Sequence, residues 1–234
     1  MKIQGVQRVS LLDFPEKIAC TVFTCGCNFR CPFCHNASLV VPEKMSAETT
    51  DEEEFFAFLS TRINKLDGVC ITGGEPLLQP DIENFIRRIR ALGFSVKLDT
   101  NGSRPQILKD LVRAGLIDYV AMDIKNSPER YAMTVGLANP PMDKIRESIA
   151  FLLSGAVPYE FRTTVVEEFH TGEDMGSIGR RIKGASRYFL QGFIDSGSLI
   201  SGISGNLHAC SSDQMQSFRR IAAEYIPSTE LRGV

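Results

Sequence analysis

Residues 18–34 read IACTVFTCGCNFRCPFC, a short apolar run that leads directly into a loop of closely spaced cysteines. The run 18–24 is rich in β-branched and aromatic residues, which is typical of a buried strand. The loop after it contains Cys27, Cys31 and Cys34 in the spacing C-x3-C-x2-C. Three thiolates on one short loop indicate a metal site. Three protein ligands rather than four would leave an iron–sulfur cluster with one iron open to another ligand.

Two other uses of these cysteines stay open. Zinc could be bound by the three thiolates and His35, but His35 directly follows Cys34, and zinc motifs space such ligands by two or more residues. The spacing therefore favours an iron–sulfur cluster. Cys25 offers a second frame, C-x5-C-x2-C, in which Cys27 would be free. The remaining cysteines are expected in the core as small buried residues: Cys20, Cys70 and Cys210.

The composition fits an ordinary globular enzyme. The chain has 234 residues, a formal net charge of −2, 43% hydrophobic and 23% charged residues. This charge indicates no nucleic-acid partner and no acidic membrane, and no apolar run reaches the ~18 residues of a membrane span. The N-terminus lacks the apolar segment of a secretory signal, and clustered cysteines argue against a disulfide framework. We expect one cytoplasmic domain over 1–234, with a core at about 18–192 and a variable loop and closing helix over 193–234.

Strand and helix patterns alternate along the chain. Strands are expected at 18–24, 68–72, 95–99, 119–124, 160–166 and 186–191. Helices are expected at 50–64, 81–92, 104–114, 142–153 and 214–225. This alternation indicates an α/β fold with a parallel sheet and helices outside it. Six strands rather than eight predict a partial six-stranded (β/α)6 barrel, with its chemistry at the C-terminal strand ends.

Polar and charged residues follow several of the expected strands. They are Thr72-Gly73-Gly74-Glu75-Pro76 after the second, Asp99-Thr100-Asn101-Gly102 after the third, Asp123-Ile124-Lys125 after the fourth, and Arg162 within the fifth. Two adjacent glycines permit a tight turn and the close approach of a ligand. In a parallel barrel these strand ends converge on one face, although each residue alone would fit an ordinary cap, turn or ion pair. The Gly- and Ser-rich segment 192–209 is expected to be a long loop, either a lid or binding loop or a plain connection.

The cysteine spacing, with the GGEP turn one βα unit later, resembles the radical S-adenosylmethionine (SAM) superfamily. The resemblance implies that Cys27, Cys31 and Cys34 hold a [4Fe–4S] cluster and that SAM binds the fourth iron through its amino and carboxylate groups. It also implies that the backbone of the turn holds the amino group of SAM. The residues that it places at the SAM site in these two segments are Phe33, Gly73, Gly74, Glu75 and Pro76.

The DTNG and MDIK segments resemble, more narrowly, the glycyl-radical enzyme activases of that superfamily. The resemblance implies that Asp99, Thr100 and Asp123 bind a monovalent cation beside SAM. It places Lys125 close to the SAM carboxylate. It also places Asp99, Asn101 and Arg162 at the SAM site.

Further segments are similar to one branch, the anaerobic ribonucleoside-triphosphate reductase activating proteins. They are SLLDFP at 10–15, CHN at 34–36, EFRTTVV at 160–166 and YFLQ at 188–191. The resemblance runs from about Ser10 to Gln191. Cys25 and the region 192–210 depart from the branch, which leaves the partner-specific part of the chain without a match.

This resemblance implies an enzyme that cleaves SAM reductively and removes a hydrogen from a glycine of a partner. The implied partners are a glycyl-radical enzyme, closest to anaerobic ribonucleoside-triphosphate reductase, and a flavodoxin or ferredoxin-type electron donor. Alternatives are activation of pyruvate formate-lyase or another glycyl-radical enzyme, and a small-molecule reaction such as that of carboxy-deazaguanine synthases. A zinc-stabilised interaction module is a different class, which would need neither the GGEP turn nor converging charged strand ends.

Overall fold

The computed structural model describes residues 1–34, 36–41, 49–195, 199–200 and 206–233. His35, the fourth ligand in the zinc alternative, lies outside the described residues, as does most of the centre of the 192–209 loop. Among the described residues, no helix is both long enough and apolar enough to cross a membrane.

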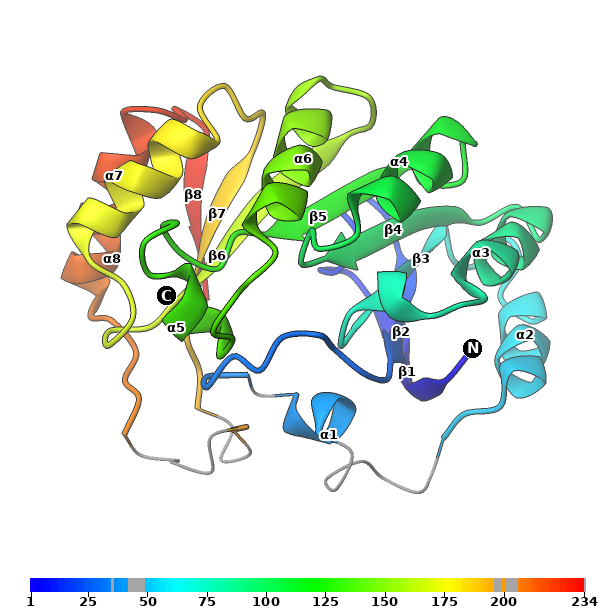
Figure 1. Cartoon of the computed structure of the whole chain (residues 1–234). Coiled ribbons are helices and arrows are strands. Elements are labelled where there is room, and N and C mark those ends of the chain that lie inside the picture. Colours follow the sequence, from blue (N-terminus) through cyan, green and yellow to red (C-terminus); the bar gives the residue numbers. More distant parts are fainter. Residues whose placement is uncertain (35, 42–48, 196–198, 201–205, 234) are drawn as a thin grey trace.

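One eight-stranded sheet with its strands in sequence order forms the centre of the fold (Figure 1). The six predicted strands are all present, as β2 Ala19–Thr24, β3 Gly68–Gly73, β4 Ser95–Thr100, β5 Tyr119–Asp123, β6 Tyr159–Val165 and β7 Tyr188–Gly192. These strands run parallel to one another. The α/β class is therefore confirmed, with a sheet that remains open between its two edge strands.

The predicted count of six strands is two short. Strand β1, Ile3–Ser10, pairs antiparallel with β2, and β8, Thr229–Arg232, pairs parallel with β7. Both have weak apolar patterns, because β1 is exposed or half-buried over most of its length and β8 has only four residues. Arg232 of β8 is anchored by tertiary contacts instead, through an ion pair with the buried Glu160 at 2.9 Å and a stack on the Phe189 ring.

Helices cover the outside of the curved sheet as an arc (Figure 1). The helices of this arc are α2 Glu52–Ser60, α3 Ile82–Ala91, α4 Pro105–Arg113, α6 Met142–Leu153, α7 Gly172–Arg181 and α8 Ser212–Ala223, whereas the short helices α1 Ala37–Val40 and α5 Tyr131–Val135 lie apart from it. Helix α2 begins where the sequence indicated, because the Asp51 side chain accepts hydrogen bonds from the backbone of Glu53 and Glu54. Helix α7 was not predicted, since three of its ten residues are glycines.

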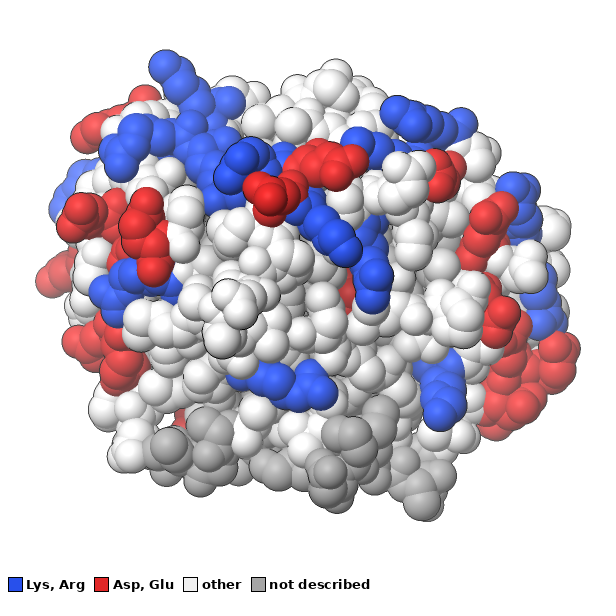
Figure 2. Space-filling model, viewed as in Figure 1, with Lys and Arg blue, Asp and Glu red and all other residues white. Residues whose placement is uncertain are grey.

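Strand alternation separates an apolar outer face from a polar inner face. In β4, Val96 and Leu98 belong to the main hydrophobic core, whereas Lys97 and Asp99 lie on the opposite face and contact each other. The same alternation in the neighbouring strands places Thr72, Asp123 and Arg162 around one cavity. The fold thus uses one side of the sheet for packing and reserves the other for chemistry. In the view of Figure 2, basic and acidic side chains lie mostly toward the top and the two sides, and the central area is largely uncharged.

Candidate functional site

The three motif cysteines line a cavity at the C-terminal ends of the parallel strands. Its volume is about 310 Å³, and Cys27, Cys31 and Cys34 all contribute to its wall. All three thiols are free, with Cys31 buried and the other two half-buried. Burial raises the pKa of Cys27 to about 11 and that of Cys31 to about 12, while Lys125 acts in the opposite direction on both. Thiolates in this place need a strong cationic partner, which is what iron ions of a cluster supply. The donor set therefore fits an iron–sulfur cluster.

Cys25 lies in a different environment. Its thiol donates a hydrogen bond to Gln4 Oε1 at 3.1 Å, on the side of strand β1, and Cys25 is absent from the wall of the cavity. Its backbone carbonyl accepts a hydrogen bond from Gln79 at 2.6 Å. This geometry supports the frame that starts at Cys27.

Backbone contacts hold the cysteine loop in place. The Arg30 guanidinium donates to the carbonyls of Cys27 at 2.6 Å and Phe29 at 2.8 Å, and the Arg30 backbone N–H donates to Val135 at the end of α5. A Cβ atom on Gly136, which has a φ of +64°, would lie 2.3 Å from the Arg30 carbonyl oxygen. Only glycine permits that approach, so the glycine that ends α5 also allows close contact with the cysteine loop.

The GGEP turn packs directly against the start of the same loop. Gly74 N–H donates to the Thr24 carbonyl at 2.9 Å, and Glu75 N–H donates to the Gly26 carbonyl at 2.8 Å. A Cβ on Gly74 would lie 1.9 Å from the Gly26 oxygen. The second glycine is thus required for contact between the two motifs. Gly73 and Gly74 line the cavity, which leaves them available to a ligand as well.

Glu75 turns its side chain away from the cavity. Its carboxylate is fully buried and accepts hydrogen bonds from Leu77 N–H at 3.1 Å, Thr100 Oγ1 at 2.8 Å and Asn101 N–H at 2.6 Å. Burial raises the pKa of Glu75 to about 7, against the effect of these three donors. Glu75 and Pro76 are not part of the cavity wall. Glu75 instead joins the GGEP turn to the DTNG segment.

Charged side chains from β4, β5 and β6 alternate in sign along the inner face of the sheet. Asp99 contacts Lys97 and Arg162, and Asp123 contacts Arg162 and Lys125. Burial by itself would raise the pKa of both aspartates, but Arg162 and the lysines more than offset it and hold each pKa below its usual range. Both carboxylates are therefore ionised, and Lys125 carries its charge close to the motif cysteines.

Sequence reasoning missed several residues of this region. Lys97 was not singled out, although its position two residues before Asp99 on a strand places both on one face. Asn28 was also missed: it links the cysteine loop to Asn101 at 3.0 Å and to Ser103 at 2.9 Å. From the 192–209 loop, Ile200 lines the cavity, and its N–H donates to the Cys34 carbonyl at 3.3 Å. This described part of the loop therefore contacts the site.

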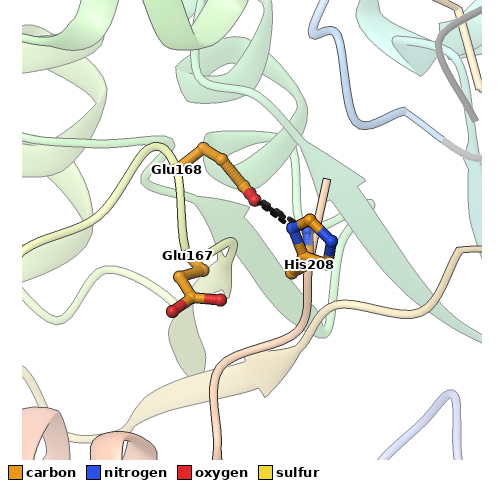
Figure 3. A group of neighbouring side chains, drawn as sticks. All are labelled: Glu167, Glu168 and His208. Atoms are coloured by element: carbon orange, nitrogen blue, oxygen red, sulfur yellow. Dashed lines mark hydrogen bonds and ion pairs between the residues drawn. The ribbon is translucent and has the colours of Figure 1, made fainter. Parts of the chain in front are cut away.

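A second group of ligand-type side chains lies on the surface (Figure 3). His208 Nδ1 lies 2.6 Å from Glu168 Oε1, and the His208 N–H donates to the same carboxylate at 3.1 Å, while Glu167 lies beside them. All three residues are exposed. These contacts fasten the end of the 192–209 loop to the segment after β6, which accounts for the group without a metal.

An open parallel α/β sheet, with three thiols and a mixed-charge cavity at its strand ends, defines an iron–sulfur enzyme that binds a small zwitterionic ligand. The model of the radical SAM superfamily matches residues 21–174. The chain belongs to the radical SAM superfamily. It is therefore an enzyme that uses a [4Fe–4S] cluster and SAM to generate a radical by SAM cleavage. This membership also excludes the zinc-stabilised interaction module.

Known proteins resemble the chain at two levels. It is 30% identical over 238 residues to a candidate glycyl-radical enzyme activating enzyme of Methanocaldococcus jannaschii, covering 99% of this chain and 96% of that protein. It is 29% identical to the pyruvate formate-lyase-activating enzyme of Listeria monocytogenes over 156 residues, 60% of each chain. In fold, it resembles Streptococcus suis SuiB bound to precursor peptide SuiA, with a TM-score of 0.69 and 13% identity over 91% of this chain and 48% of that one.

Proposed function

We propose that the chain activates a glycyl-radical enzyme, and that the partner is an anaerobic ribonucleoside-triphosphate reductase. The observation that carries the activase role is the likeness to the Methanocaldococcus protein, because it extends over 99% of this chain and 96% of that one. The choice of the reductase rests on the sequence segments described above.

The geometry supports a protein substrate. In the described residues the sheet does not close between β1 and β8, and the cavity wall extends from Gln7 of β1 to Gln191 of β7. An open side of this kind leaves room for an extended peptide segment of another protein. The cavity offers a binding site for SAM on its charged wall, next to the cysteine loop.

The reaction balances with one external electron. A [4Fe–4S] cluster held by Cys27, Cys31 and Cys34 would supply the one-electron chemistry, and the proposed source of the electron is a flavodoxin or ferredoxin-type protein. The S–C5′ bond of SAM breaks, and the products are methionine, 5′-deoxyadenosine and a glycyl radical formed by loss of one Cα hydrogen. The residues of this chain bind and orient. Lys125 and Arg162 offer positive charge to the SAM carboxylate, and Asp99 and Asp123 hold those two cations in place.

Electron paramagnetic resonance tests this function directly. Reconstituted protein, SAM and a reductant are mixed anaerobically with anaerobic ribonucleoside-triphosphate reductase, pyruvate formate-lyase or other glycyl-radical enzymes. We expect a glycyl doublet with the reductase, and none with a reductase whose radical glycine is replaced by alanine. A doublet only with another enzyme would replace the partner. SAM cleavage with no doublet for any candidate, together with turnover of a deazapurine precursor, would move the function to small-molecule chemistry.

A further inference from the structure

The aspartates expected to bind a monovalent cation already have cationic partners. Asp99 Oδ1 accepts a hydrogen bond from Lys97 Nζ, and Asp99 Oδ2 accepts one from Arg162 Nη1 at 3.1 Å. Asp123 Oδ1 accepts from Arg162 Nε at 2.9 Å, and Asp123 Oδ2 accepts from Lys125 Nζ at 2.9 Å. Each of the four carboxylate oxygens therefore meets a donor that carries positive charge.

Thr100, the third expected ligand, is also engaged. Its hydroxyl donates to Glu75 Oε1 at 2.8 Å and accepts from the Gly102 N–H at 3.1 Å. Thr100 is buried where the DTNG segment meets the GGEP turn. A metal ion at this hydroxyl would compete with the backbone of Gly102 for the same oxygen.

The charge balance also opposes a further cation. Two carboxylates, Asp99 and Asp123, pair with three cations, Lys97, Arg162 and Lys125. This network of five side chains therefore has a net charge of +1. Within this group of five residues the cations already outnumber the carboxylates, so Asp99 and Asp123 need no added monovalent ion to balance their charge. An anionic group, such as the carboxylate of SAM, would be attracted to the same region. The residues do not fit the predicted cation site.

Lys97 supplies the charge that makes this balance. It is 2% exposed, and its ammonium lies between Asp99 and the Cys70 thiol, which is 3.7 Å away. A lysine buried to this degree is costly to fold unless it is paired, so its place beside Asp99 is fixed by the aspartate. Arg162 is held as firmly, because its guanidinium spans both aspartates.

We propose that Lys97 and Arg162 replace the monovalent cation, so that this chain orders the aspartates of its SAM site with its own side chains. Lys97 takes the position beside Asp99 that an ion would otherwise fill, and Arg162 joins Asp99 to Asp123. The inference concerns SAM binding and holds whichever partner receives the radical. Its failure can therefore be distinguished from failure of the proposed function.

The wild-type protein gives the first test. SAM affinity of the reconstituted protein is measured by anaerobic calorimetry with potassium, sodium or choline as the only monovalent cation, at one ionic strength. The thermal midpoint of the cluster-free protein is recorded in the same three salts. We expect affinities equal within twofold and equal midpoints. A saturable gain of tenfold or more in affinity, or a raised midpoint, in potassium or sodium relative to choline would overturn the inference.

Lys97→Met gives the second test, because it removes the charge and keeps much of the side-chain volume. The variant frees Asp99 Oδ1, so we expect it to bind SAM at least tenfold more weakly in choline and to recover in potassium or sodium. Lys109→Met is the matched control, since Lys109 pairs with Glu147 on the outside of the sheet; it should remain insensitive to the choice of cation. A folded Lys97→Met protein whose SAM affinity is the same as that of the wild type in all three salts would contradict the proposal. If the variant does not fold, the wild-type comparison decides.

Discussion

Cys25 and Cys27 are two residues apart in the chain but have different surroundings. Cys27 lies on the cavity wall, where its sulfur accepts a hydrogen bond from the Phe29 N–H at 3.3 Å. Cys25 contacts Gln4 on the opposite side of the strand end. These surroundings support the frame that starts at Cys27, which the spacing of the family also favours.

Alanine substitutions test that frame. After anaerobic reconstitution, Cys27→Ala is expected to lose SAM cleavage and to bind less iron and sulfide, because one of three thiolate ligands is missing. Cys25→Ala is the matched control and should keep both the cluster and at least half of the cleavage rate. Iron and sulfide analysis with quantification of 5′-deoxyadenosine provides the measurement. Loss of activity in Cys25→Ala, with Cys27→Ala still active, would reverse the assignment.

Glu75 is expected to act on stability through its buried hydrogen bonds. The two oxygens of Glu75 accept hydrogen bonds from the backbone N–H groups of Leu77 and Asn101. In Glu75→Gln, an NH₂ group takes the place of one of these oxygens, so one buried N–H group loses its acceptor. We expect a loss of about 1–3 kcal/mol in the free energy of unfolding, measured by urea denaturation of the cluster-free protein. Glu83→Gln is the control, because Glu83 forms an exposed i,i+4 pair with Arg87 and should cost about 0.5 kcal/mol or less. Equal effects of the two substitutions would contradict the stabilising role of the buried Glu75 hydrogen bonds.

At the level of single residues, the sequence predicted which residues belong to the site, but it predicted few of the contacts between them. The strand-end positions of Asp99, Asp123 and Lys125 were visible because each follows an apolar run. The pairing of Arg162 with two aspartates depends on the register of three neighbouring strands. Register is set by tertiary packing, so these contacts were outside the reach of sequence patterns.

Among the elements, the segment between β6 and α7 holds the backbone of Lys125 in place through His170. His170 is buried there; its Nδ1 accepts from the Val166 N–H at 3.1 Å, and its Nε2 donates to the Lys125 carbonyl at 2.9 Å. This arrangement requires a neutral ring, and burial lowers the pKa of His170. The segment thereby links the backbone of Lys125 to β6.

A pH dependence follows from that lowered pKa. Below about pH 6.5 the unfolded histidine binds a proton that the native ring resists, so the free energy of unfolding falls as the pH decreases. His170 can contribute up to about 1.4 kcal/mol per pH unit in this range. Urea denaturation of the cluster-free protein between pH 7.5 and 5.5 should show a steeper loss for the wild type than for His170→Gln. Parallel curves for the two proteins would exclude His170 as the source.

Helix α7 depends on glycine where it meets α8. A Cβ on Gly179 would lie 2.5 Å from Cδ2 of Tyr225, whereas one on Gly176 would meet its nearest neighbour, Arg180 Nη1, at 3.5 Å. Gly179→Ala is therefore expected to lower the free energy of unfolding by about 1–3 kcal/mol through overpacking. Gly176→Ala is the control within the same helix, and should be neutral or stabilising by up to about 1 kcal/mol. Thermal or urea denaturation that finds Gly179→Ala as stable as Gly176→Ala would contradict this packing.

Elements with a strong apolar period were predictable, and those held by tertiary contacts were not. Helices α3 and α4 were found at nearly their observed bounds because their apolar residues share one face. Helix α7 was not predicted because its glycines, which allow close packing against α8, weaken the local helix pattern. Strands β1 and β8 escaped because a half-exposed edge and a four-residue strand carry little apolar pattern.

For the whole molecule, strand–helix alternation was enough to predict a parallel α/β fold with its site at the C-terminal strand ends. Sequence patterns could not predict how far the sheet extends, since β1 and β8 are held by pairing with β2 and β7 and have little apolar pattern of their own. They also could not show that the cavity is walled by both the cysteine loop and Ile200 of the 192–209 loop. These features depend on how the strands are assembled around one centre.

We infer that three thiolate ligands leave one iron of the cluster for SAM. Electron paramagnetic resonance of the reduced, reconstituted protein tests it most directly, with nitrogen-15-labelled SAM and electron–nuclear double resonance. We expect that adding SAM changes the cluster spectrum and reveals a coupling to the labelled amino nitrogen, in the wild type and in Cys25→Ala alike. A cluster spectrum that is identical with and without saturating SAM, and that shows no nitrogen coupling, would contradict it.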